Sequence, residues 1–131
     1  MSILESLHDL CVSKGISVAV AESCTSGLIA SKLTLKSGSS SFFKGGIIAY
    51  QNAIKIKILG VDEQAILQYT EVSTEVVKQM AEGVRKSFFA DYSIATSGYA
   101  GPSGGTNNNS IGTVFIAISS VSGVDVERFI F

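Results

Sequence analysis

Small and hydroxyl-bearing residues gather at a predicted junction between a strand and a helix, in the segment 21–30 with the sequence Ala-Glu-Ser-Cys-Thr-Ser-Gly-Leu-Ile-Ala. The alternating, β-branched residues 16–20 before it predict a strand, and the apolar periodicity after Gly27 predicts a helix. Such a junction presents side chains and backbone N–H groups to a ligand at the carboxyl end of the strand. Ser23 and Thr25 supply hydroxyls there. The same residues also fit a plain capped helix start, and this segment alone does not decide between the two.

A catalytic serine at this junction needs a base, and the sequence offers a lysine rather than a histidine. The single histidine, His8, lies on the first predicted helix, far along the chain from the junction, so we expect no Ser-His-Asp triad. A lysine that burial keeps neutral can instead activate a serine. Lys55 follows a predicted strand, and Tyr50 at the strand end can relay a proton or orient the pair. A solvated surface lysine and a rim-packing tyrosine are the alternatives.

The residues on either side of Ser23 have less reactive interpretations. Glu22 can act as a base or can anchor the loop by accepting N–H bonds, and we favour the anchor. Cys24 can be a thiol nucleophile, but a small buried side chain is the commoner role of a free cysteine. The two cysteines, Cys11 and Cys24, form no CxxC pair, and His8 has no ligand partners at metal spacing. We therefore predict neither a disulfide framework nor a metal site.

A second glycine-rich segment, residues 97–106, follows another predicted strand. It lacks the Lys-Ser/Thr ending of a Walker loop and does not run directly into a helix, so it is not a nucleotide fingerprint. Its backbone N–H groups can still bind a phosphate or carboxylate. The alternative is a flexible surface loop without a ligand. Residues 22–27 and 50–55 also follow strands, and in an α/β sheet such segments converge on one edge. Three polar segments at one edge predict a ligand site.

The elements that must position these residues alternate along the chain. Helices are expected over 2–14, 28–36, 53–59, 62–67 and 73–90, and strands over 16–20, 45–50, 91–96, 111–119 and 124–131. Helices and strands alternate in the first part of the chain, and two strands form a hairpin at its end. This order predicts an α/β fold. We expect a mixed, mostly parallel sheet with helices packed on both faces and a C-terminal β-hairpin. Residues 1–131 are expected to form one domain.

Composition excludes several classes of function. Hydrophobic residues make up 46% and charged residues 16% of the 131, which is typical of a globular protein. The net charge is −1 and no basic run occurs, so we expect no nucleic-acid partner. No signal-like N-terminus is present, and no apolar run approaches the ~20 residues that span a bilayer. We therefore expect a cytoplasmic protein with no membrane partner.

Taken together, these segments resemble the C-terminal domain of the competence-associated CinA family, also found alone as nicotinamide-nucleotide amidase. The matching segments occur in family order over nearly the whole chain, at 21–27, 38–40, 45–50, 52–55, 59–61, 72–73, 90–91, 97–105 and 112–114. The resemblance implies a hydrolase that converts nicotinamide mononucleotide to nicotinate mononucleotide and ammonia, without a cofactor. The family's nucleophilic serine falls on Ser23, its lysine on Lys55 and its tyrosine on Tyr50. We expect Ser23 Oγ and the Lys55 amine within hydrogen-bond reach.

Substrate contacts are expected from the strand-end loops. Thr25 and the backbone N–H groups near it are candidates to stabilise the oxyanion, and the glycine loop is expected near the nucleotide. The candidate substrate-binding residues are Thr25, Gly27, Gly45, Gly46, Ser97, Gly98, Gly101, Gly104 and Gly105.

The sequence departs from the family pattern in ways that bear on function. Ser26 stands where the family usually has Gly, and Ala53 where it usually has Glu. The family usually continues past the last strand into a Gly-Asp-Arg segment and a closing helix, whereas this sequence ends at Phe131. A catalytically weakened nucleotide-binding or regulatory module is therefore the alternative, and a structural oligomerisation domain is a third. A bare sheet face would expose Phe129 and Phe131 or recruit a partner subunit, and we expect a homodimer or higher homo-oligomer.

Overall fold

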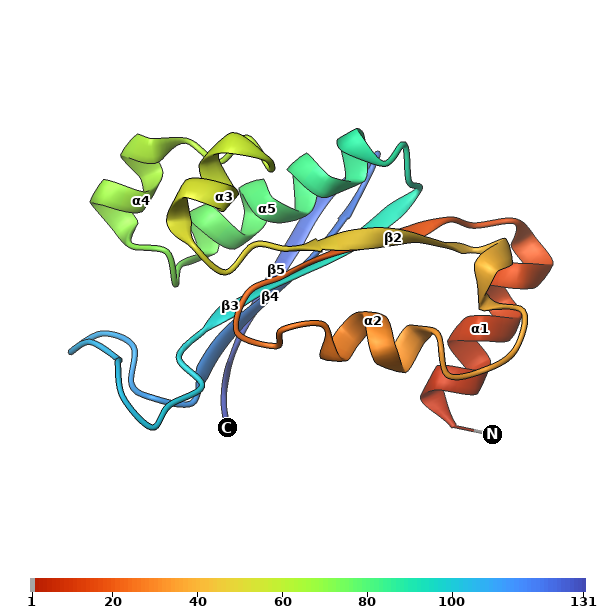
Figure 1. The fold of residues 1–131 in the computed structure, drawn as a ribbon, viewed down its shortest axis with the longest axis horizontal. Coiled ribbons are helices and arrows are strands. Elements are labelled where there is room, and N and C mark those ends of the chain that lie inside the picture. Colours follow the sequence, from red (N-terminus) through yellow and green to blue (C-terminus); the bar gives the residue numbers. More distant parts are fainter. Residues whose placement is uncertain (1) are drawn as a thin grey trace.

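The computed structural model describes residues 2–131, which form a five-stranded mixed sheet with helices on both faces (Figure 1). The strands are β1 (Val18–Glu22), β2 (Phe43–Ile48), β3 (Tyr92–Gly98), β4 (Thr113–Ser120) and β5 (Gly123–Ile130). They lie in the order β2-β1-β3-β4-β5. β1 pairs in parallel with β2 and β3, whereas β3–β4 and β4–β5 pair antiparallel. The predicted α/β class and C-terminal hairpin are confirmed, but parallel and antiparallel pairings occur equally within this sheet.

One face of the sheet is covered by α3 (Asn52–Lys57), α4 (Glu63–Tyr69) and α5 (Thr74–Ser87) (Figure 1). Ser73 caps α5 by accepting a hydrogen bond from the Val76 N–H at 3.3 Å, and Glu75 lies in its positive first turn. The apolar stripe of α5 packs on the sheet to form the larger core. Its buried members on α5 are Val76, Val77, Met80, Ala81 and Val84. This core holds α3, and with it Lys55, close to the carboxyl end of β1.

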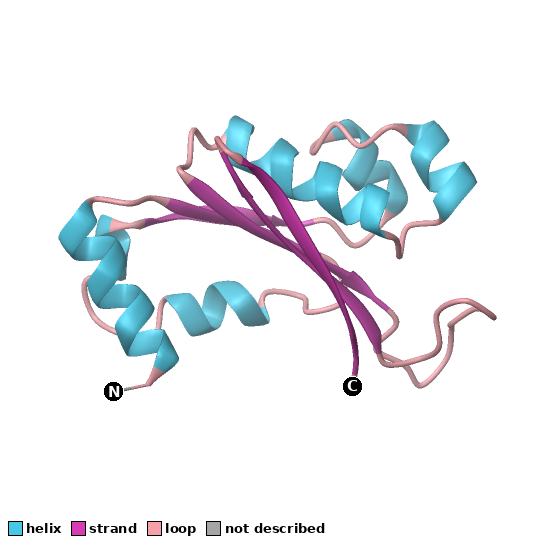
Figure 2. Cartoon of the chain, turned by 180° about the vertical axis from the view of Figure 1, so that it is seen from behind, coloured by secondary structure: helices cyan, strands magenta, loops and turns pink. Residues whose placement is uncertain are grey.

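The opposite face is covered by α1 (Ile3–Lys14), α2 (Leu28–Leu33) and a short 3₁₀ turn at Ser39–Ser41 (Figure 2). A smaller core fills this side, made of Cys11, Val18, Val20, Leu33 and Phe42. Gly15 ends α1 in a left-handed conformation, which glycine adopts readily at a helix C-terminus. Helices therefore cover both faces, as expected.

The β4–β5 end of this second face is not covered by α1 or α2. Ile118 is 48% exposed and Phe131 is 81% exposed, and Phe129 stacks on Phe131 with ring centroids 5.9 Å apart. A shallow hollow of about 470 Å³ runs along these strands, lined by apolar side chains together with the two acidic residues Asp125 and Glu127. The expected exposure of Phe129 and Phe131 is confirmed.

Two strands are shifted by about two residues from their predicted positions. β1 ends at Glu22 rather than residue 20, so that Ser23 directly follows the strand. β2 begins at Phe43, which places Gly45 and Gly46 inside it rather than at its entrance. No helix among residues 2–131 is long and apolar enough to cross a membrane.

Candidate active site

Ser23 and Lys55 meet at the carboxyl end of β1. The Lys55 Nζ donates to Ser23 Oγ at 3.2 Å and to the backbone carbonyl oxygen of Tyr50 at 3.0 Å. The expected hydrogen-bond contact between the two side chains is therefore confirmed. Lys55 is 1% exposed and Ser23 is 8% exposed, so the contact is shielded from water.

Burial changes the acid–base behaviour of Lys55. Removal of the ammonium from water lowers the pKa of Lys55 below its ordinary 10.5, and the negative charge of Glu71 opposes part of that shift. A lower pKa increases the fraction of neutral amine near neutral pH. A neutral amine can accept the Ser23 hydroxyl proton along the same contact, which is the chemistry of a serine activated by lysine.

The loop that carries Ser23 is held by the buried carboxylate of Glu22. Its Oε1 accepts hydrogen bonds from the N–H groups of Gly27 at 3.1 Å and Ile29 at 2.9 Å, and its Oε2 accepts one from Ala30 N–H at 2.9 Å. The Thr25 hydroxyl adds a fourth, at 2.6 Å. These donors include the free N–H groups of the first turn of α2, which the positive helix end directs toward an anion. Glu22 is thus an anchor, the role favoured from the sequence.

Replacing Glu22 with glutamine should lower the free energy of unfolding by about 2–4 kcal/mol. The amide keeps the shape but loses the charge, and its NH₂ group would face N–H donors that now have no acceptor. Urea unfolding at pH 7 measures the change. Glu63→Gln is the control, because Glu63 is exposed on α4, and it should cost no more than about 0.5 kcal/mol. Equal stabilities of the two variants would contradict the anchor.

Ser23 and Lys55 line a cavity of about 260 Å³ where the three strand-end segments converge. Its walls come from the loop after β1, from α3 and its approach, from the turn before α5, and from the loop after β3. The lining residues are Ser23, Cys24, Tyr50, Asn52, Lys55, Glu71, Val72, Ser97, Gly98, Tyr99, Ala100, Gly101 and Ser103. The candidates Tyr50, Ser97, Gly98 and Gly101 are thus brought to the same place as Ser23 and Lys55.

The other candidate substrate-binding residues lie outside this lining. They are Thr25, Gly27, Gly45, Gly46, Gly104 and Gly105. The Thr25 hydroxyl is turned inward, between Glu22 and the Thr96 hydroxyl at 2.7 Å, so it is not directed at a substrate. At Gly46 a Cβ would lie 2.4 Å from Val20 Cγ2, so this glycine serves the close pairing of β2 with β1.

The remaining glycines have conformational or packing roles. Gly27 precedes α2 with φ +99°, and Gly45 has φ +130° with a Cβ position 3.3 Å from the Phe88 ring. Gly104 and Gly105 lie further along the loop with φ of +106° and +87°. Positive φ values of this kind favour glycine independently of any ligand.

Tyr50 and Ser97 also make contacts that hold other parts of the site. The Tyr50 side chain is 68% exposed on the cavity rim, and it is its carbonyl oxygen that holds Lys55. The Ser97 hydroxyl donates to the Glu71 carbonyl at 2.6 Å and so fixes the turn before α5. Tyr50 therefore supports the site through its backbone carbonyl, and Ser97 through its side-chain hydroxyl.

Six residues of the lining had no individual role predicted from the sequence, namely Asn52, Glu71, Val72, Tyr99, Ala100 and Ser103. Asn52 lies within the segment 50–55 and Tyr99 within the segment 97–106, both of which were expected at the site. Glu71 lies in the turn between α4 and α5, where no local pattern indicated a role. Cys24 also lines the cavity, and burial raises the pKa of its thiol. A protonated thiol is a weak nucleophile, which favours Ser23 over Cys24.

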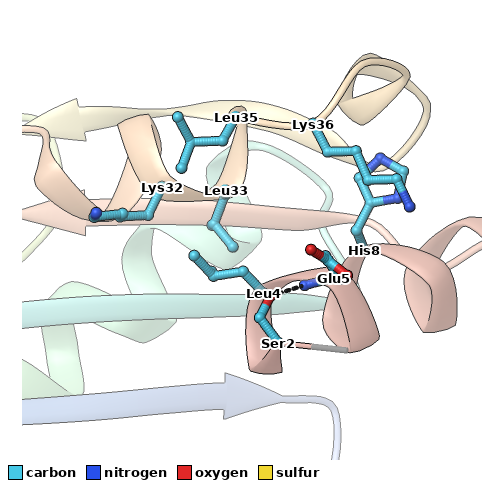
Figure 3. Close-up of a pocket in the computed structure, with 8 residues that line it drawn as sticks. All are labelled: Ser2, Leu4, Glu5, His8, Lys32, Leu33, Leu35 and Lys36. Atoms are coloured by element: carbon cyan, nitrogen blue, oxygen red, sulfur yellow. Dashed lines mark hydrogen bonds between the residues drawn. The ribbon is translucent and has the colours of Figure 1, made fainter.

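A second cavity, of about 460 Å³, lies between α1 and α2 and contains His8 (Figure 3). The imidazole packs edge-on against Phe42 with ring centroids 5.3 Å apart. Both of its nitrogens are sealed from solvent and neither makes a hydrogen bond with residues 2–131, although Nδ1 lies 3.5 Å from the Asp9 carboxylate. Lys36 on the rim pairs with Asp9 at 2.9 Å. His8 is thus a packed side chain whose nitrogens do not reach a ligand in this cavity.

The whole chain is similar to a family of known proteins. The family described as CinA C-terminal domain matches residues 1–131. A CinA-like protein of Shewanella pealeana is 45% identical over 123 residues, which are 94% of this chain and 29% of the relative. A CinA-like protein of Flavobacterium psychrophilum is 45% identical over 125 residues, which are 95% of this chain and 30% of the relative. The chain thus spans less than a third of the length of these curated relatives.

Solved structures share the fold. Competence damage-inducible protein A (ComA) of Klebsiella pneumoniae matches with a TM-score of 0.93 at 29% identity, over 98% of this chain and 80% of that one. A CinA superfamily protein of Escherichia coli also matches at 0.93, with 32% identity, over 98% of this chain and 74% of that one. The competence/damage inducible protein CihA of Agrobacterium tumefaciens matches at 0.90 with 33% identity, over 100% and 85%. The fold and the match over residues 1–131 show that the chain belongs to the CinA C-terminal domain family.

Proposed function

We propose that this domain is an amidohydrolase that deamidates nicotinamide mononucleotide to nicotinate mononucleotide and ammonia. The observation that carries the proposal is the buried contact between Ser23 Oγ and Lys55 Nζ at 3.2 Å, in the wall of a cavity. Such a pair suits acyl transfer at an amide carbon. The choice of nucleotide rests on the resemblance of the sequence motifs to nicotinamide-nucleotide amidase.

In the proposed mechanism the neutral Lys55 amine takes the proton of Ser23 Oγ as the oxygen attacks the carboxamide carbon. The C–O bond forms and the carbonyl oxygen becomes an oxyanion. The Lys55 ammonium then protonates the amide nitrogen, the C–N bond breaks, and ammonia leaves an ester on Ser23. Water attacks this ester as Lys55 accepts one of its protons, the bond between the acyl carbon and Ser23 Oγ breaks, and the Lys55 ammonium returns the proton to Ser23 Oγ as nicotinate mononucleotide leaves. The Tyr50 carbonyl keeps the amine in place through both steps.

The oxyanion needs donors other than the Thr25 hydroxyl. The backbone N–H groups of Cys24 and Thr25 donate to no other residue among residues 2–131, and they directly follow Ser23 in the chain. We assign the oxyanion to these amides. One such donor is typically worth about 3 kcal/mol of barrier.

Ammonia release from nicotinamide mononucleotide by the purified chain tests the proposal. We expect ammonia and nicotinate mononucleotide to form in equal amounts, since one amide bond is broken per turnover. Nicotinate mononucleotide, which lacks the amide nitrogen, is the control substrate and should release none. Binding of the nucleotide without turnover would contradict the amidase and favour the regulatory module.

The change at Ala53 does not separate the catalytic pair. Ala53 lies on α3 with Lys55, and the Tyr50 carbonyl already holds the Lys55 amine. This arrangement favours the active enzyme over the weakened module. We also propose that the protein is a cytoplasmic homo-oligomer.

A further inference from the structure

The active-site cavity contains one carboxylate, that of Glu71, which the proposed mechanism does not use. Glu71 lies in the turn between α4 and α5 and is half-buried. Its side chain forms no hydrogen bond or ion pair with any of residues 2–131. A partly buried carboxylate without a partner is unfavourable unless a positive group meets it.

The backbone around Glu71 is held in place. The Ser97 hydroxyl donates to the Glu71 carbonyl at 2.6 Å, and the Asn109 side chain donates to the next carbonyl, that of Val72, at 3.2 Å. These contacts tie the turn to the end of β3 and to the loop that follows it. The carboxylate is therefore presented to the cavity by a fixed segment.

Lys55, the basic side chain of the cavity, does not balance the charge of Glu71 when its amine is neutral and ready to accept the Ser23 proton. Lys55 must be neutral to accept the Ser23 proton, and its burial favours that form. No arginine lines the cavity. The cavity then carries a net charge of −1 from Glu71 when the enzyme is ready to react.

Aromatic side chains complete the environment. Tyr99 is half-buried and lines the cavity, and Tyr50 lies on its rim. Aromatic faces attract cations, and their attraction adds to that of a carboxylate. A carboxylate together with aromatic rings is the chemistry that recognises a flat, positively charged ring.

We propose that Glu71 and Tyr99 bind the cationic ring of a pyridinium substrate, and that they make the site select amides on charged rings over amides on neutral rings. This inference rests on the proposed function, since the ring is the one whose carboxamide Ser23 attacks. The selectivity depends on the charge of the ring and not on contacts to the ribose or phosphate.

Comparing two forms of the nucleotide measures the effect of the ring charge on binding. Nicotinamide mononucleotide and its reduced 1,4-dihydro form share the carboxamide, ribose and phosphate, but only the first has a cationic ring. Calorimetry with the Ser23→Ala chain measures binding of both without hydrolysis. We expect the oxidised form to bind about tenfold more tightly, and Glu71→Gln to remove most of that preference by weakening the oxidised form alone.

Two further variants serve as controls. Glu71→Asp keeps the charge and should retain most of the preference. Glu63→Gln removes an exposed carboxylate outside the cavity and should change neither affinity by more than about twofold. Circular dichroism of each variant confirms that it is folded.

The outcomes separate this inference from the proposed function. If Glu71→Gln weakens both forms equally, or neither, the ring site is wrong even if ammonia is released. If the preference depends on Glu71 but the parent chain releases no ammonia, the ring site stands and the amidase is wrong. If neither form binds, both are wrong.

Discussion

Replacing Ser23 with alanine should reduce ammonia release from nicotinamide mononucleotide by about 10⁴-fold or more. The variant lacks the oxygen that forms the ester, and Lys55 then has no proton to accept. Its affinity for the nucleotide should stay within about twofold, because the change removes one buried oxygen and leaves the remaining cavity lining in place. Steady-state kinetics and calorimetry measure the two quantities.

Cys24→Ala is the matched control, since it removes the neighbouring nucleophilic atom from the same loop. Burial raises the pKa of the Cys24 thiol, so we expect this variant to keep the rate within about threefold. If Cys24→Ala abolishes turnover while Ser23→Ala retains it, the thiol is the nucleophile and the proposed mechanism is wrong.

Replacing Lys55 with methionine should lower kcat/KM by about 10³-fold to 10⁴-fold and should change its pH dependence. Methionine fills a similar volume, so the loss reports the missing amine rather than a cavity. In the parent enzyme the rate should rise with pH as Lys55 loses its proton. Because burial lowers the pKa of Lys55, this rise should lie below pH 10.5, and it should be absent from the variant.

Lys57→Met provides the comparison for this prediction. Lys57 lies two residues further along α3, and its side chain is exposed rather than directed into the site. Turnover and its pH profile should be close to those of the parent. Equal losses in both variants would mean that α3 tolerates no such change, and they would leave Lys55 without a distinct role.

The helices and strands were largely predictable because each carries a local apolar pattern. The ends of β1 and β2 were not, because tertiary contacts decide them. An apolar pattern predicts that a strand ends before a charged residue. Glu22 nevertheless belongs to β1 and is buried, and its carboxylate accepts hydrogen bonds from four donors. The contact that stabilises this charge comes from the following helix and is invisible in the strand itself.

The candidate site shows a similar limit. Ser23 and Lys55 were recognised from their motifs, and the structure brings them together. Glycines gave a weaker indication, since a glycine required by neighbouring backbone looks the same in sequence as one required by a ligand. Gly46, packed against Val20, is of the first kind. Glu71 was missed because only the fold moves its turn next to Lys55.

The parallel pairing of β1 with β3 also sets when this site can form during protein synthesis. It aligns Val18 with Tyr92, and Ser17, just before β1, bonds through its N–H to Asp91, 74 residues later, at 2.8 Å. The N–H of Ser23 itself donates to the carbonyl of Thr96 at 3.2 Å. A ribosome adding ~5–20 residues per second would expose Ser23 roughly 4–15 s before its partner strand exists. The proposed nucleophile is therefore fixed only late in translation, and a nascent chain that ends before β3 carries Ser23 and Lys55 without the strand pairing that positions Ser23.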